Sequence, residues 1–194
     1  DNLNRLVRVD RRNTSAGGTL IGREESKYDD LSRVYQSIQY GVDPATGTVG
    51  ESLTNNRWYD PVGNVAKSLP AGADRWTKTT YDTLNRPTTV YAGYGTDASY
   101  ADIFDVTGDV VLEQAETAYD DASNVTATTR RQRYHNASTS ATGSLNDPST
   151  APKARVTYAV IYPDPLGRAQ AQANYGTNGG TALTRPTTIP ARSD

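Results

Sequence analysis

Three pairs of adjacent carboxylates are the first candidates for general acid–base chemistry, which needs acidic side chains that converge on one substrate. These pairs are Glu24 with Glu25, Asp29 with Asp30, and Asp120 with Asp121. Neighbouring residues on a β-strand point to opposite faces of the sheet, so such pairs would not converge. The sequence therefore predicts turn or surface roles for all three pairs.

The single histidine, His135, has no nucleophile in a recognisable setting. A serine hydrolase would carry a Gly-x-Ser-x-Gly elbow and a thiol enzyme would carry a cysteine, and the sequence contains neither. One histidine without cysteine also excludes the usual multi-histidine and Cys-based metal centres. We therefore expect no catalytic residue, no cofactor and no metal, and a solvated loop position for His135.

Three other patterns have a weaker chemical meaning. Aspartate-rich turns offer oxygen ligands for Ca²⁺, but no Asp-x-Asp-x-Asp-Gly loop occurs. The glycine-rich stretch Gly176 to Gly180 is not followed by the Lys-Ser/Thr of a phosphate-binding loop. The basic run Arg130 to Tyr134 fits either a solvated hairpin face, which we favour because alternate residues point to opposite faces, or a polyanion site.

Composition limits the function classes further. With 20 basic against 22 acidic residues the net charge is −2, which argues against a nucleic-acid partner. No apolar run approaches the roughly 20 residues that cross a bilayer. The absence of methionine predicts a fragment of a larger protein. The 13 tyrosines and two tryptophans predict a β protein whose core is built from tyrosine rather than leucine.

One seven-residue pattern recurs seven times, and each copy begins with aspartate. The copies start at Asp1, Asp29, Asp60, Asp82, Asp105, Asp120 and Asp164. An aromatic residue precedes five of them: Tyr28, Tyr59, Tyr81, Phe104 and Tyr119. A repeat at this scale indicates an array of similar supersecondary units.

Each position of the pattern suits a tight turn between two strands. The aspartate can accept a hydrogen bond from the backbone two residues on. Glycine or asparagine at the fourth position suits the left-handed conformation of a three-residue hairpin loop, whereas Ser32 and Ser123 fit that position less well. The leucine or valine at the third position is expected to pack back under the turn. Besides the aromatic and aspartate residues from copies two to seven, the predicted structural turn residues are Gly63, Asn64, Asn85, Arg86, Gly108, Asn124, Gly167 and Arg168.

The segments between turns predict strands. Val156, Tyr158, Val160 and Tyr162 alternate onto one face of a strand over 155–162. Further strands are expected over 34–40, 76–81, 87–91, 110–119 and 125–134. Long loops are expected at about 41–56 and 135–153, and a loop or frayed end at 176–194. We expect one all-β array of antiparallel hairpins over residues 1–194, forming a curved, twisted strip.

These residues carry a family resemblance. Tyr59-Asp-Pro-Val-Gly-Asn64, Tyr81-Asp-Thr-Leu-Asn-Arg86 and Tyr119-Asp-Asp-Ala-Ser-Asn124 resemble the YD repeat of the Rhs (rearrangement hotspot) family. The resemblance extends from Asp1 to about Ala171. It implies a β-hairpin strip that coils into part of a hollow shell, as in bacterial Rhs and toxin-complex proteins, where the shell surrounds a C-terminal toxin. It also implies a secreted or cell-surface location, with flanking repeats and an enclosed C-terminal domain as partners.

The segment Asp164-Pro165-Leu166-Gly167 has two interpretations. It is similar to the Asp-Pro-x-Gly element at the end of Rhs shells, where the chain cleaves itself. It equally fits an ordinary repeat turn, because Asp164 is in register with the other six aspartates.

Two functional hypotheses follow from the resemblance. The first is a structural, non-catalytic segment of a β shell that encapsulates or scaffolds a toxin-like domain. The alternative is an extracellular carbohydrate-binding or adhesion module that uses exposed tyrosine and tryptophan, because related repeats in animal teneurins are linked to adhesion and carbohydrate contact. An enzyme is not expected.

Overall fold

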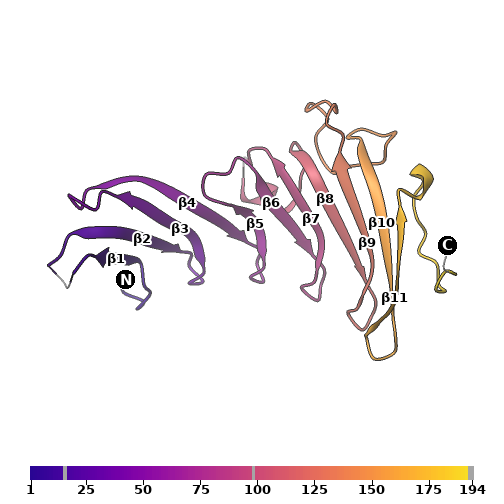
Figure 1. Ribbon diagram of the computed structural model, residues 1–194, viewed down its shortest axis with the longest axis horizontal. Helices are drawn as coiled ribbons and strands as arrows, with labels where there is room; N and C mark the ends of the chain where they lie inside the picture. Colours follow the sequence, from indigo (N-terminus) through magenta and orange to yellow (C-terminus); the bar gives the residue numbers. More distant parts are fainter. Residues whose placement is uncertain (15–16, 98, 192–194) are drawn as a thin grey trace. The chain divides into compact units, whose positions relative to one another are not determined.

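Within the residues that the structure describes, the chain forms eleven β-strands and two short 3₁₀ helices (Figure 1). The computed structural model describes residues 1–14, 17–97 and 99–191. Strands that follow one another in the chain pair in antiparallel fashion, β1 to β5 in one series and β7 to β11 in another. The predicted fold class, all-β with antiparallel hairpins, is confirmed. The chain divides into two compact units, Asp1–Trp76 and Thr77–Asp194.

The first unit is a meander of antiparallel strands. It contains β1 (Arg8–Arg12), β2 (Leu20–Tyr28), β3 (Val34–Val42), β4 (Val49–Tyr59) and β5 (Val65–Leu69). These strands pair in chain order. The repeat turns at Asp29 and Asp60 join β2 to β3 and β4 to β5.

The second unit continues the same pattern, and it takes in β6 (Trp76–Tyr81) from its second residue onward. It contains β7 (Pro87–Tyr94), β8 (Val110–Tyr119), β9 (Val125–Arg133), β10 (Ala154–Pro163) and β11 (Ala169–Gly176), with helices η1 (Tyr100–Phe104) and η2 (Asn178–Gly180). Strands β7 to β11 also pair in chain order. The repeat turns at Asp82, Asp120 and Asp164 therefore lie at one end of these strands, and the longer connections 95–109 and 134–153 at the other.

The predicted loop at 41–56 is wrong, because most of it is strand. β3 continues to Val42, and β4 begins at Val49 and pairs with β3. β4 is rich in Gly, Ser, Thr and Asn, so it has no apolar alternation to reveal it. Its register is instead fixed partly by polar contacts: the Gln36 Nε2 donates to the Asn56 Oδ1 across the pair at 2.8 Å.

Apart from Gly176, the last residue of β11, the other two predicted loops contain no β-strand among the described residues. The segment 135–153 is nevertheless tied to the sheet: Gly143 forms a bridge with Val110, and Leu145 is buried. After β11, Arg185 donates hydrogen bonds to the backbone carbonyls of Thr126 and Ile161. Both segments thus cover part of the second unit's sheet.

The expectation of a tyrosine-built core is wrong. In the described part of the chain the buried apolar residues are mostly aliphatic, and Tyr162 is the single tyrosine among them. Val111 and Val160 have 0% of their surface exposed. The other tyrosines are partly exposed because several of them lie at strand ends, where the hydroxyl reaches a backbone carbonyl.

The two tryptophans, which the adhesion hypothesis requires to be exposed, are buried or half-buried. Trp76 is buried and Trp58 is half-buried. The Lys67 ammonium lies 5.1 Å from the Trp58 ring centre and 5.7 Å from that of Trp76. This cation–π contact holds both indoles inside the first unit. An adhesion surface built on tryptophan therefore has no support.

The third turn position also differs from the expectation, because its apolar side chain points to solvent. Leu84 is 62% exposed, and the equivalent residues of four other turns are more exposed still: Leu3, Leu31, Val62 and Leu166. The physical reason is that the turn is closed by polar contacts of its aspartate, which leave no apolar surface for this side chain to cover.

This arrangement predicts a contrast between two substitutions in the second unit. Leu84→Ser should change the free energy of unfolding by less than about 0.5 kcal/mol, because the side chain is already in water. Val111→Ala should cost about 2 kcal/mol, because it leaves a cavity at a fully buried site. Urea denaturation followed by circular dichroism measures both. Equal losses would contradict the exposure of Leu84 and the burial of Val111.

Candidate functional site: the clamped repeat turns

Six of the seven repeat turns share one hydrogen-bonding pattern. In the Asp82 turn, the Asp82 amide donates to the Arg86 carbonyl and the Asn85 amide donates to the Asp82 carbonyl, both at 3.0 Å. The Asp82 Oδ1 accepts from the amides of Leu84 and Arg86 at 2.9 and 3.0 Å. The backbone turn is thus closed twice, once by main chain and once by the aspartate carboxylate.

The fourth position of every copy has a positive φ. The residues are Asn4, Ser32, Gly63, Asn85, Gly108, Ser123 and Gly167. Serine adopts this left-handed conformation less readily than glycine or asparagine. Ser32 and Ser123 gain a contact there, because their hydroxyls accept hydrogen bonds from Arg5 and Arg86 at 3.3 and 3.0 Å. The conformation expected for this position is therefore kept throughout the array.

The fifth position holds the side chain that binds the turn's own aspartate. The Nε of Arg5, Arg33, Arg86 and Arg168 donates to the Oδ2 of the aspartate four residues earlier, at 2.6–2.8 Å. In two turns asparagine replaces arginine: the Nδ2 of Asn64 and Asn124 donates to Asp60 and Asp120 at 2.9 and 3.0 Å.

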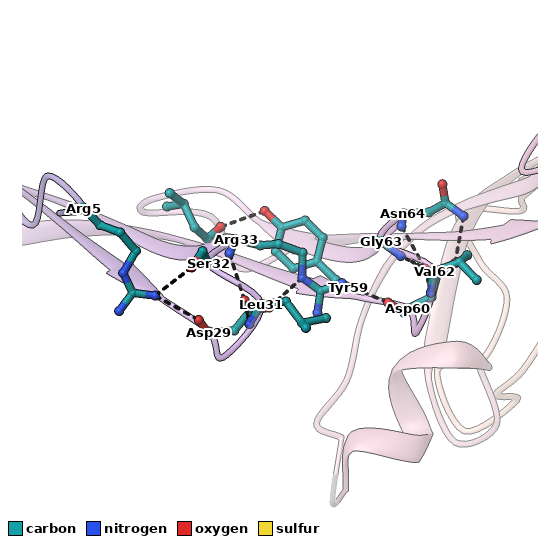
Figure 2. Close-up of polar contacts among 11 residues, drawn as sticks. Arg5, Asp29, Leu31, Ser32, Arg33, Tyr59, Asp60, Val62, Gly63 and Asn64 are labelled. Carbon is teal, nitrogen blue, oxygen red and sulfur yellow. Dashed lines mark hydrogen bonds and ion pairs between the residues drawn. The ribbon is translucent and has the colours of Figure 1, made fainter. Parts of the chain in front are cut away.

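Three of the four arginines also reach the next turn of their unit. Figure 2 shows Arg5 extending from its own turn to that of Asp29, where its Nη1 donates to the Asp29 carbonyl at 3.2 Å. Arg33 repeats the contact one turn further on, donating to the Asp60 carbonyl at 3.1 Å. One planar guanidinium thus binds two successive turns, because it carries several N–H donors that point in different directions.

Where arginine reaches the next turn, the tyrosine before that turn's aspartate completes the contact. The Arg33 guanidinium lies 4.5 Å from the Tyr59 ring centre, and the Tyr59 hydroxyl donates back to the Val34 carbonyl at 2.8 Å. Arg5 and Tyr28 have the same relation, with a guanidinium-to-ring distance of 4.8 Å and a hydrogen bond from Tyr28 to the Leu6 carbonyl at 2.9 Å. We call this combined contact of arginine, tyrosine and aspartate a turn clamp.

A third turn clamp lies in the second unit. Arg86 is 4.6 Å from the Tyr119 ring centre and donates to the Asp120 carbonyl at 3.1 Å. The Tyr119 hydroxyl donates to the Pro87 carbonyl at 2.9 Å. The clamping arginines at positions 5, 33 and 86 keep only 22–24% of their side-chain surface exposed. Arg168 makes the contacts within its own turn but is 75% exposed.

The copy at Asp105 departs from the pattern. Phe104 ends helix η1 rather than a strand, and the turn bond runs from the Asp109 amide to the Val106 carbonyl. The fifth position is Asp109, which cannot pair with the Asp105 carboxylate. This copy is therefore the end of the long β7–β8 connection and not the corner of a hairpin.

Hydrogen bonding lowers the pKa of the turn aspartates. At Asp82 the largest cause is the hydrogen bond from the Arg86 backbone; at Asp120 and Asp164 it is the side chain of Asn124 or Arg168. At Asp29 and Asp60 burial is the largest influence and acts to raise the pKa, but the hydrogen bonds together outweigh it and the pKa is still lowered. The folded turns thus favour ionised aspartate.

The carboxylate pairs do not converge on a common point. On β2, Glu24 pairs with Arg11 at 2.8 Å, whereas Glu25 accepts a hydrogen bond from the Tyr40 hydroxyl at 3.0 Å. In the other two pairs the first aspartate closes a turn and the second is exposed.

The basic run on β9 is neutralised or engaged by its neighbours. Arg130 pairs with Glu113 and Arg131 with Glu116, both at 2.7 Å. Arg133 donates to the carbonyls of Ser138 and Ala141 at 2.6 Å and so anchors the following loop. These contacts favour the hairpin-face interpretation over a polyanion site. His135 is exposed in the loop beyond β9.

The segment Asp164 to Gly167 has the geometry of an ordinary repeat turn. The Asp164 amide donates to the Arg168 carbonyl at 2.8 Å, and the Gly167 amide donates to the Asp164 carbonyl at 2.8 Å. The turn joins β10 to β11 in the same way as the other hairpin turns.

Sequence reasoning missed the second role of the fifth position. It named Arg86 and Arg168 as turn residues but not Arg5 or Arg33, and it treated each turn as independent. The sequence did contain a signal for this role. For Arg5, Arg33 and Arg86 alike, the next hairpin turn of the same unit begins with Tyr-Asp.

Neither a metal cluster nor a membrane-spanning helix is found in the parts of the chain that the structure describes. No three His, Asp or Glu side chains there are grouped as a metal site would require. No described helix has the length and apolar character to cross a membrane.

The fold and the turns define an antiparallel β-hairpin array whose turns are linked side by side. No protein-family model and no curated protein matches the chain. It is similar to chains in the crystal structures of TcdB2-TccC3-Cdc42 and TcdB2-TccC3, each with a TM-score of 0.38, at 11% and 10% identity. A third is TcdB2-TccC3-TEV, with a TM-score of 0.36 and 10% identity. Each match covers 89% of this chain and 9% of the other, so the chain spans a small part of the structures it resembles.

The turn clamp predicts that Arg86→Ala destabilises the second unit more than Arg168→Ala does. Both lose the pairing with their own aspartate, but only Arg86 also loses a carbonyl contact and a tyrosine ring. The difference in the free energy of unfolding should be about 1–2 kcal/mol. Urea denaturation of the two variants measures it, and equal effects would show that the cross-turn contact contributes nothing.

The lowered aspartate pKa values predict acid sensitivity. An aspartate whose folded pKa lies below its ordinary value of 3.8 stabilises the fold above that pH and loses this stabilisation as the pH falls through the folded pKa. The free energy of unfolding should therefore hold steady from neutral pH to about pH 5 and decline below about pH 4. Asp82→Asn should make the decline shallower, and an unchanged slope would contradict the assignment.

Proposed function

We propose that the chain is a structural, non-catalytic segment of a YD-repeat β wall in a large secreted or cell-surface protein. Its role is to encapsulate or scaffold a C-terminal, toxin-like domain. The observation that carries this proposal is the turn clamp, because it joins neighbouring hairpins within each unit and gives the array a means of extension.

The exposed end of the array supports the flanking repeats as partners. β11 is an edge strand, and Arg168 presents the same guanidinium that positions 5, 33 and 86 insert into the following turn. A further hairpin that begins with Tyr-Asp would fit both the strand edge and the arginine. Stacked repeats bury their faces mainly against neighbours, so a wall of this kind is stabilised by continuation.

The test is protease protection in the full-length protein that carries the chain. The domain following the repeats should resist trypsin under native conditions and become cleavable when denaturant unfolds the wall. A double substitution of Arg33→Ala and Arg86→Ala should raise the cleavage rate several-fold, because it removes two clamps.

The matched control is Arg11→Ala, which removes an exposed ion pair outside the clamps and should leave the cleavage rate unchanged. If the following domain were cleaved as fast in the native protein as in isolation, the encapsulating role would be rejected.

A carbohydrate-binding role is the second candidate, and one cavity favours it. A cavity of about 530 Å³ in the second unit is lined by Tyr134 and Tyr158 together with the polar side chains of Glu116, Arg131 and Asp147. Aromatic rings beside hydrogen-bonding groups suit a sugar. A glycan array probed with the chain and with Tyr158→Ala distinguishes the roles: binding lost in the variant would favour adhesion, and no binding would reject it.

A further inference from the structure

Lys78 is a buried lysine whose nitrogen is in contact with two carboxylates. Its side chain comes from β6, and only 2% of the residue is exposed. The Nζ lies 2.7 Å from the Asp109 Oδ2 and 2.7 Å from the Asp97 Oδ1. All three residues belong to the second unit. An amine held against a carboxyl group, with a second carboxyl group beside it, has the components of an amide-forming site.

Two backbone carbonyls orient the nitrogen. Lys78 donates to the carbonyls of Asp102 and Asp105, each at 2.8 Å. A neutral amine has two hydrogens, and these two carbonyls can accept both of them. The nitrogen lone pair would then be available to a carboxyl group in contact with the nitrogen.

The chain closes tightly around the Asp109 carboxyl group. A β-carbon at Gly95 would lie 2.0 Å from the Asp109 Oδ1, so no larger residue fits there without displacing the carboxyl group. The Asp109 side chain keeps 5% of its surface exposed, and the Asp97 side chain keeps 12%. Asp109 is thus the more sequestered carboxyl group, while Asp97 retains more access to solvent.

Burial reduces the cost of moving a proton from lysine to aspartate. Charged groups away from water are disfavoured, and a buried acid–base pair can neutralise itself by proton transfer. One lysine and two aspartates have a net charge of −1 whether the proton is on Lys78 or on Asp109. A held pair also reacts as though highly concentrated, which favours condensation.

We propose that Lys78 and Asp109 form an intramolecular amide bond, with Asp97 relaying protons. One proton passes from the Lys78 ammonium to the Asp109 carboxylate. The amine lone pair then attacks the Asp109 carbon, so that an N–C bond forms. Asp97 removes a proton from the nitrogen and delivers it to the Asp109 hydroxyl. The C–O bond breaks, one water leaves, and Asp97 is ionised again, so the net charge is unchanged and no redox partner is required.

The link would fix the β7–β8 connection to β6. Asp109 is the last residue of that connection, which includes η1 and departs from the hairpin pattern, and Lys78 lies on β6. A covalent bond there would close a ring through residues 78–109 and restrict the unfolded chain, as a disulfide does. It would supply a clip where no hairpin turn is present.

Mass spectrometry of the purified chain tests the proposal. The denatured protein should be lighter than its sequence mass by one water. Trypsin should not cleave after Lys78, and because the Arg86–Pro87 bond resists trypsin, the linked species should appear as one peptide from Trp76 to Arg130 that is also lighter by one water. Recovery of the peptide from Thr79 to Arg130, at full mass, from a sample with β-sheet circular dichroism would overturn the proposal.

Three variants identify the bonded atoms. Asp109→Asn should lose one ammonia instead of one water, an outcome that requires reaction at position 109. Lys78→Arg retains a cation in the site but should have its full sequence mass. Asp97→Ala should leave the link unformed or at least tenfold slower to form. A water loss that persists in Lys78→Arg would place the modification elsewhere and overturn the assignment.

Discussion

The structure depends on a guanidinium that binds two turns at once. Each clamping arginine forms an ion pair with the aspartate of its own turn and donates to the aspartate carbonyl of the next turn. It also lies against the tyrosine that precedes the aspartate of the next turn. The tyrosine hydroxyl returns a hydrogen bond to the strand that follows the arginine. A strand pair is held along its length by its ladder, and the clamp adds a constraint at the end, where hairpins otherwise fray. A chain with few large aliphatic residues can in this way order its hairpins through polar and cation–π contacts.

Asparagine can replace arginine at the fifth position and still close its own turn. Asn64 and Asn124 bind the aspartates of their turns at 2.9 and 3.0 Å. The Asn124 side chain also lies against the next turn of the second unit, because a β-carbon at Gly167 would meet the Asn124 Oδ1 at 2.7 Å. At positions 5, 33 and 86 the guanidinium adds a hydrogen bond to the next aspartate carbonyl.

The turns and several strands could be predicted because their signals are local. Asp82 and Asn85 specify a hairpin by their own conformational preferences, and Val156 to Tyr162 alternate visibly. β2 and β4 were not predicted, because both carry polar residues on each face and the two-residue apolar period is absent. Pairing with neighbouring strands decides their structure. The burial of Leu145 and the exposure of Leu84 could not be predicted from the sequence either. They depend on which loop folds over the sheet and on the polar closure of the turn, and neither is a property of leucine itself.

The copy at Asp105 resembles the other six copies in sequence but does not form a hairpin turn. Its fourth residue has the left-handed conformation of the other copies, and its aspartate still accepts from the amide two residues on. The difference lies at the fifth position, where aspartate replaces the arginine or asparagine that would close the turn. A carboxylate there has no partner within the heptapeptide and needs a cation from elsewhere, which Lys78 provides. An acidic residue at the fifth position thus replaces the contact that closes a hairpin turn with an ion pair to another strand. Asp109 attaches the long β7–β8 connection to β6 through the buried Lys78.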